Sequence, residues 1–85
     1  MKGWLYLIRN RDLYKIGITK NYESRMRQLK PDSVVAKLYT SNFIKLEREL
    51  HHRYKNFRIP QTENFRLEKQ HLKEIKHLIS YLQYS

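Results

Sequence analysis

The chain of 85 residues (10.6 kDa) is long enough for one domain. It carries 18 Lys and Arg against 8 Asp and Glu, which gives a formal net charge of +10 with its four His neutral. The absence of Cys excludes disulfide scaffolds and thiolate zinc sites and favours a reducing, cytoplasmic setting. No apolar run is long enough to span a membrane. The expected partner is a polyanion, with nucleic acid ahead of an anionic membrane surface.

The first two predicted elements form a β-hairpin. Residues 4–9 and 12–19 are rich in β-branched and aromatic side chains, and the polar pair Asn10-Arg11 separates them as a two-residue loop. In that register Tyr6 lies directly opposite Lys15. The apolar face, which we predict to be core, carries Leu5, Leu7, Tyr14, Ile16 and Ile18. The other face, which we predict to be the working face, carries Trp4, Tyr6, Lys15 and Gly17.

The remaining elements alternate helices with one more strand. Asn21 is predicted to cap a short helix over residues 22–29, and Pro31 ends it. A third strand follows over residues 33–39, with Val34, Ala36 and Leu38 on one side. A longer helix begins at Thr40 or Ser41, and its apolar stripe is Phe43, Leu46, Leu50, Tyr54 and Phe57. Residues 63–67 form a short connector or an extended piece, and a last amphipathic helix covers about residues 69–83.

This order, ββαβαα, predicts an α+β fold in which helices pack on a small three-stranded antiparallel or mixed sheet. The whole chain, 1–85, forms one domain, and the last helix is a structural C-terminal extension.

At the hairpin the sequence resembles the GIY-YIG nuclease superfamily. Trp4-Leu5-Tyr6 followed by Lys15-Ile16-Gly17 resembles its paired signature, and Arg25, eight residues after Gly17, its catalytic arginine. Glu63 in Glu63-Asn64-Phe65 resembles its metal-binding glutamate. The run from Tyr14 to Thr19 and the Leu50-His51 helix are similar to a compact phage and bacterial branch. The resemblance covers about residues 3–68. It departs at Trp4 (Gly in the family), at Lys15 (Tyr) and at Leu29 (often His).

The resemblance implies a GIY-YIG-type endonuclease that hydrolyses phosphodiester bonds in double- or single-stranded DNA with low sequence specificity. Tyr6 would receive the proton of the attacking water, Arg25 would contact the scissile phosphate, and Glu63 would hold one Mg²⁺ or Mn²⁺ ion. The predicted hairpin register adds Lys15 as the cation that stabilises the Tyr6 phenolate. Candidate nucleic-acid contacts are Lys20, Arg27, Lys37, Arg48, His51, Arg53 and Lys55.

The same residues also permit a simpler interpretation. Tyr6 is then an ordinary cross-strand aromatic, Lys15 an edge-strand charge and Arg25 a phosphate contact without a catalytic part, while Glu63 pairs with Arg58 or Arg66. The alternative function is therefore a non-catalytic, basic nucleic-acid-binding module on the same fold. His51 and His52 do not indicate a zinc site, because adjacent residues on a helix point about 100° apart.

Overall fold

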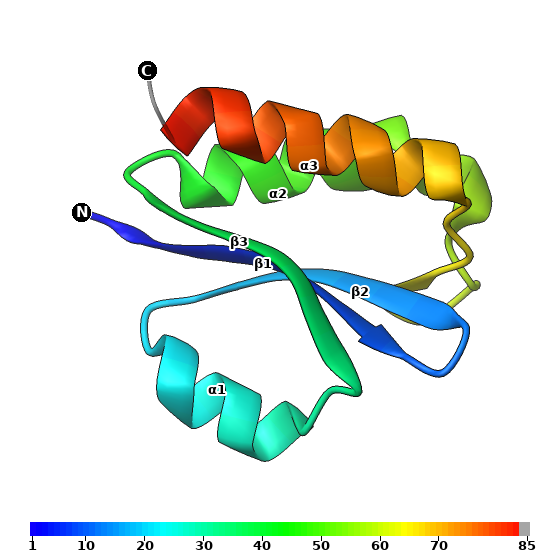
Figure 1. The fold of residues 1–85 in the computed structure, drawn as a ribbon, viewed down its shortest axis with the longest axis horizontal. Coiled ribbons are helices and arrows are strands. Elements are labelled where there is room, and N and C mark those ends of the chain that lie inside the picture. The colour runs from blue at the N-terminus through cyan, green and yellow to red at the C-terminus, as the bar shows by residue number, and fades with distance from the viewer. Residues whose placement is uncertain (84–85) are drawn as a thin grey trace.

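In the computed structural model, which describes residues 1–83, a four-stranded antiparallel sheet packs between helices (Figure 1). The strands are β1 (Gly3–Asn10), β2 (Leu13–Thr19), β3 (Ser33–Thr40) and β4 (Asn64–Phe65), in the order β3-β1-β2-β4. The helices are α1 (Tyr22–Leu29), α2 (Phe43–Arg53), the short 3₁₀-helix η1 (Lys55–Phe57) and α3 (Lys69–Gln83). Helices α2 and α3 cover one face of the sheet and α1 lies against the other. The predicted α+β class is confirmed; residues 84 and 85 of the predicted domain lie outside the described part.

The fourth strand corrects the predicted three-stranded sheet. β4 lies within the segment predicted to be a connector and pairs with β2 through Tyr14 opposite Phe65 and Lys15 opposite Asn64. Backbone hydrogen bonds also tie this segment to the chain before it, with the Arg66 N–H donating to the Phe57 carbonyl at 2.7 Å. A strand of two residues is too short to have a recognisable alternation, so sequence periodicity does not reveal it.

The hairpin register also differs from the prediction. Tyr6 lies opposite Gly17, not Lys15, and Lys15 lies opposite Ile8. The turn is Arg11-Asp12, with Arg11 in the left-handed region (φ 58°), and Asn10 stays in β1. Asp32, the residue before β3, holds this turn, because its carboxylate accepts a 2.6 Å hydrogen bond from the Arg11 N–H. The error is two residues, so each side chain stays on its predicted face.

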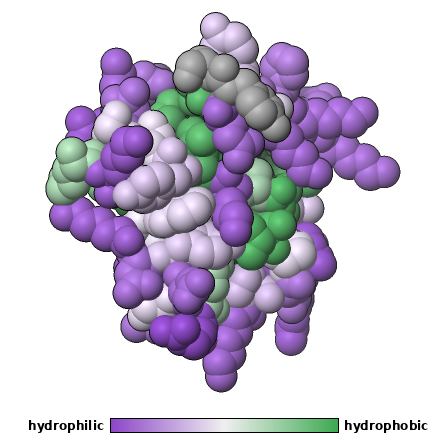
Figure 2. Space-filling model, turned by 60° about the vertical axis from the view of Figure 1, so that its left-hand side comes forward, coloured by the Kyte–Doolittle hydropathy of each residue, from purple (hydrophilic) through white to green (hydrophobic). Residues whose placement is uncertain are grey.

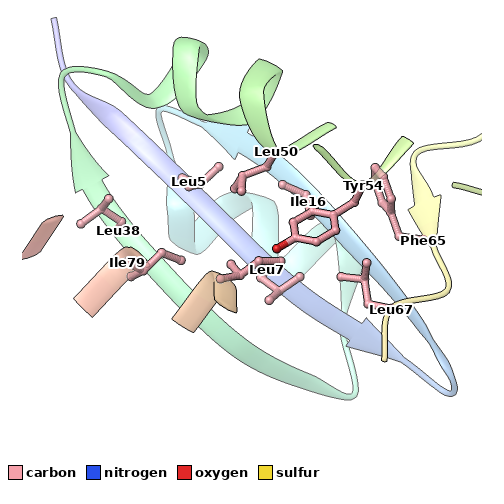
Figure 3. Close-up of a cluster of buried hydrophobic side chains, with 10 residues drawn as sticks. Leu5, Leu7, Ile16, Leu38, Leu50, Tyr54, Phe65, Leu67 and Ile79 are labelled. Carbon is pink, nitrogen blue, oxygen red and sulfur yellow. The ribbon is translucent and has the colours of Figure 1, made fainter. Parts of the chain in front are cut away.

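The core lies between the sheet and the α2–α3 layer, as the apolar patterns predict. Leu5, Leu7 and Ile16 from the hairpin are each about 1% exposed. Figure 3 shows them meeting side chains from α2, α3 and the β4 segment; these include Leu50, Tyr54, Phe65, Leu67 and Ile79. Within residues 1–83, no helix is long and apolar enough to cross a membrane.

A β-bulge changes the predicted alternation of β3. Leu7 pairs with Ala36 but Ile8 pairs with Val34, so Val35 is an extra residue on β3. Leu38 is buried as predicted, whereas Val34, on the far side of the bulge, is 40% exposed.

The Tyr54 hydroxyl donates a 2.7 Å hydrogen bond to Glu74 and so ties α2 to α3. Burial, together with the Glu74 carboxylate, raises the pKa of Tyr54 to about 12 from its ordinary value of 10.0. Because the pKa of Tyr54 is raised in the folded state, the Tyr54–Glu74 contact contributes to stability below pH 10, and that contribution is lost as the pH rises toward 12. As the pH rises through that range, we expect the free energy of unfolding, measured with urea, to fall less in Tyr54→Phe than in the parent chain. Equal pH slopes in the two proteins would contradict this role.

Candidate active site

Tyr6 is the centre of the candidate site. It lies in the middle of β1 on the face turned away from the core, yet its side chain is only 2% exposed. Its ring lies directly over Gly17 on β2: a Cβ placed on Gly17 would overlap the Tyr6 hydroxyl and ring. The glycine is therefore required by the close approach of the Tyr6 ring to the β2 backbone.

Helix α1 brings Arg25 close to Tyr6. The Asn21 side chain caps this helix by accepting a 3.1 Å hydrogen bond from the Ser24 N–H, as the sequence predicts. The rings of Trp4 and Tyr22, 5.1 Å apart, hold the first turn of α1 against β1. Arg25 follows one turn after Tyr22, and its positive charge acts on Tyr6 to lower the pKa of the phenol.

Glu63 enters the site from the turn before β4. Thr62 fixes that turn, because its hydroxyl donates to the Ile59 carbonyl at 2.8 Å and accepts from the Asn64 N–H at 3.1 Å. The Glu63 carboxylate forms an ion pair with Lys15 Nζ at 3.5 Å, and its side chain is 63% exposed. Neither Arg58 nor Arg66, the partners considered from sequence, forms this pair: Arg66 lies 3.5 Å from Asp12 instead.

The protonation of Tyr6 reflects four surrounding influences. Burial is the largest and raises its pKa, the Arg25 charge lowers it, and the carboxylates of Glu63 and Glu47 raise it further. The net pKa lies above the ordinary value, so Tyr6 is a neutral phenol at neutral pH. The predicted position of Lys15 directly opposite Tyr6 is wrong, because Gly17 lies there. Lys15 pairs with Glu63, and the charge that lowers the pKa of Tyr6 is that of Arg25.

Sequence reasoning missed Glu47, which α2 brings to the same place. Burial raises its pKa, the His51 charge lowers it, and Glu63 raises it because the two carboxylates repel each other. The missed signal is its position: Glu47 lies four residues after Phe43 and three before Leu50, and so borders the buried stripe of the helix. A carboxylate at that boundary is held partly out of solvent.

Glu47 and Glu63 are the residues that could hold a divalent cation. Each carboxylate raises the pKa of Tyr6, and Glu63 also raises that of Glu47, which shows that they share one electrostatic environment. Among residues 1–83, no three acidic, His or Cys side chains gather as a preformed metal cage. Two carboxylates fit Mg²⁺ or Mn²⁺, because such ions commonly bind through one or two carboxylates, water and substrate phosphate oxygens.

The predicted nucleic-acid contacts divide by location. Lys20 and Lys37 line one hollow beside α1, and Arg48 and Arg53 line another along α2. Arg27 and Lys55 are exposed on α1 and η1 respectively.

His51 differs from the other predicted contacts because it is half-buried. Its Nε2 lies 2.8 Å from the Ile16 carbonyl, and its ring meets the Phe65 ring edge-on at 5.0 Å. These contacts hold α2 against β2 next to Gly17, so the His51 side chain helps to position the strand beneath Tyr6.

One family model, that of the T5orf172 domain, matches residues 3–80. The chain belongs to the T5orf172 domain family. This domain occurs in phage and bacterial proteins and is often linked to GIY-YIG-like or HNH-like nucleases. No GIY-YIG model matches the chain, so its membership of that superfamily is a proposal. Comparisons with curated proteins and with solved structures give no match. The T5orf172 match includes every residue of the candidate site and most of α3.

Proposed function

We propose that this protein is a metal-dependent endonuclease of the GIY-YIG type, which hydrolyses phosphodiester bonds in DNA with low intrinsic sequence specificity. The observation that carries the proposal is the convergence of groups on Tyr6. The charges of Arg25 from α1, Glu47 from α2 and Glu63 from the turn before β4 all act on its phenol. A phenol, a guanidinium and two carboxylates on a domain of charge +10 suit the hydrolysis of a polyanion.

Each group has a role that its chemistry supports. Arg25 is exposed and close to Tyr6, so its planar donors can contact the phosphate at the bond that is cut. Tyr6 takes the proton of the attacking water, which requires the phenolate. Because its raised pKa makes the phenolate scarce at neutral pH, the cleavage rate should increase as the pH becomes alkaline.

Glu47 and Glu63 would hold one Mg²⁺ or Mn²⁺ ion, which would supply Lewis-acid stabilisation of the charge on the phosphate and on the leaving oxygen. Lys15 then has a positioning role, because its ion pair holds the exposed Glu63 side chain beside the site.

A plasmid assay tests the proposal. Supercoiled plasmid and single-stranded DNA are incubated with the protein in Mg²⁺, Mn²⁺ or EDTA, at neutral and at alkaline pH. We expect cutting that requires a divalent ion and accelerates with pH. The protein with Arg25→Ala, purified in the same way, serves as the control for contaminating nucleases and should not cut.

The second candidate function is a non-catalytic nucleic-acid-binding module. The Lys15–Glu63 ion pair favours it, because the lysine neutralises one of the two carboxylates that would hold the ion. DNA binding by gel shift without cutting under any metal or pH would support this module and overturn the nuclease.

A further inference from the structure

A cluster of three aromatic rings and one lysine lies on the surface beside the candidate site; we call it the aromatic platform. It consists of Trp4, Tyr22, Tyr39 and Lys37. The Trp4 ring lies 5.1 Å from that of Tyr22 and 5.0 Å from that of Tyr39. Lys37 Nζ lies over the rings of Tyr22 and Trp4, at 4.6 and 5.7 Å from their centroids. Positive charge and aromatic faces therefore alternate within one patch.

The platform is partly open to solvent, because Tyr39 is exposed while Trp4 and Tyr22 are half-buried. Tyr39 is 53% exposed, and Lys2 Nζ lies 5.7 Å from its ring centroid at the rim. Next to it is a hollow of about 500 Å³, lined by Trp4, Lys20, Asn21, Tyr22, Glu23 and Lys37. Figure 2 turns toward the viewer the side where β1 begins and shows a pale band of intermediate hydropathy among purple hydrophilic side chains. The volume of the hollow, about 500 Å³, lies within the range of small-ligand sites.

These rings lie outside the core, although the contact between Trp4 and Tyr22 also joins α1 to β1. They lie on the face of the sheet opposite the α2–α3 layer, and none of Trp4, Tyr22 and Tyr39 belongs to the core cluster. Exposed aromatic rings interleaved with lysines are typical of surfaces that bind unpaired nucleic acid. The bases stack on the rings while the ammonium groups contact the phosphates.

The sheet register places the platform directly beside Tyr6. Lys37 on β3 lies opposite Tyr6, and Tyr39 lies opposite Trp4. Trp4 and Tyr6 are two residues apart on β1 and share a face, which separates their Cα atoms by about 7 Å. A strand whose base stacks on the platform therefore brings a neighbouring phosphate to Tyr6 and Arg25.

We propose that the aromatic platform binds an unpaired nucleotide adjacent to the bond that is cut, so that the substrate is single-stranded or locally opened DNA. The position of the cut rests on the proposed nuclease function, whereas base binding at the platform does not. Duplex DNA buries its base faces in its own stack and offers only the phosphate charge.

Trp4 is the single tryptophan of the chain, so its fluorescence reports directly on the platform. The protein is titrated in EDTA with a short oligothymidylate, with an abasic oligonucleotide of the same number of phosphates, and with a duplex of equal length. We expect the oligothymidylate to quench Trp4 and to bind about five- to 150-fold more tightly than the abasic strand. Equal affinity for both strands, or unchanged Trp4 emission, would overturn the platform.

Two tyrosine variants separate the platform from general surface effects. Tyr39→Ala removes an exposed ring of the platform, and Tyr81→Ala removes a ring that is 68% exposed on α3. Fluorescence anisotropy of a labelled strand should show weaker single-strand binding for Tyr39→Ala alone. Equal binding by all three proteins would contradict the assignment. Base-dependent binding without cleavage in any metal would reject the nuclease and keep the platform. Cleavage without base-dependent binding would reject the platform and keep the nuclease.

Discussion

Replacing Glu47 with glutamine is expected to abolish metal-dependent DNA cleavage while leaving DNA affinity unchanged. The amide keeps the shape of the side chain but removes one of the two negative charges that act together on Tyr6. Loss of a metal-binding carboxylate should lower the rate at least about a hundredfold, because the ion contributes several kcal/mol to the stabilisation of charge. The measurement is the plasmid cleavage rate at saturating Mg²⁺ or Mn²⁺, with affinity followed by anisotropy in EDTA.

Glu49→Gln is the matched control, since it makes the same charge change on the same helix. Glu49 is exposed and lines the hollow along α2 with Arg48 and Arg53, away from Tyr6. We expect this variant to cleave like the parent chain. Full activity in Glu47→Gln, or equal loss in both variants, would remove Glu47 from the site.

Glu47→Gln should also stabilise the fold in the absence of metal. The pKa of Glu47 is raised in the folded state, so its contribution to stability is present below the unfolded pKa and is lost as the pH rises through the folded one. At neutral pH the ionised side chain therefore opposes folding, and glutamine removes that effect. Surface changes of this kind amount to at most ~0.5 kcal/mol, or about 2–4 °C in Tm for a domain of this size. A lower Tm for Glu47→Gln in EDTA would contradict the raised pKa.

Gly17→Ala is expected to have the second large effect, because the new methyl group would overlap the Tyr6 ring and hydroxyl. Tyr6 lies in a buried position between two strands, so either its ring or the β2 backbone must shift. Overpacking of this kind costs about 1–3 kcal/mol. Displacing a catalytic group by about 1 Å can reduce a rate about a hundredfold. We therefore expect both a lower Tm and a loss of cleavage.

Gly3→Ala separates these two effects. A Cβ at Gly3 would approach the Phe43 ring to 2.6 Å, so it introduces a similar overlap at the start of β1 but away from Tyr6. It should lower the Tm comparably and retain cleavage at temperatures where the protein is folded. The interpretation fails if Gly3→Ala loses as much activity as Gly17→Ala at equal fraction folded.

The sequence predicted the helices and the two faces of the hairpin because both depend on strong local periodicity. Asn21 indicates the start of α1, and the apolar stripe indicates α2, each from residues that lie close together in the chain. The register was wrong because a shift of two residues leaves every side chain on the same face. The turn that sets the register is held by a contact between Arg11 and Asp32, which lies just before β3, 21 residues further along the chain.

The candidate site was predictable in part. Tyr6, Arg25 and Glu63 came from a resemblance in motif order, and in the structure the charges of Arg25 and Glu63 both act on the Tyr6 phenol. Glu47 was missed because no local pattern distinguishes a carboxylate facing the site from the solvated charges around it. The pairing of Lys15 with Glu63 depends on β4, the strand too short to predict.

Successive side chains of β1 point to opposite faces of the sheet, which determines what a substitution in this strand changes. Leu5 and Leu7 point into the hydrophobic layer, while Trp4 and Tyr6 point toward α1. A saturation scan of this one central strand would therefore report two different properties at alternate codons. Changes at positions 5 and 7 would alter how much folded protein accumulates in the cell, whereas changes at positions 4 and 6 would also alter what that protein does once it has folded.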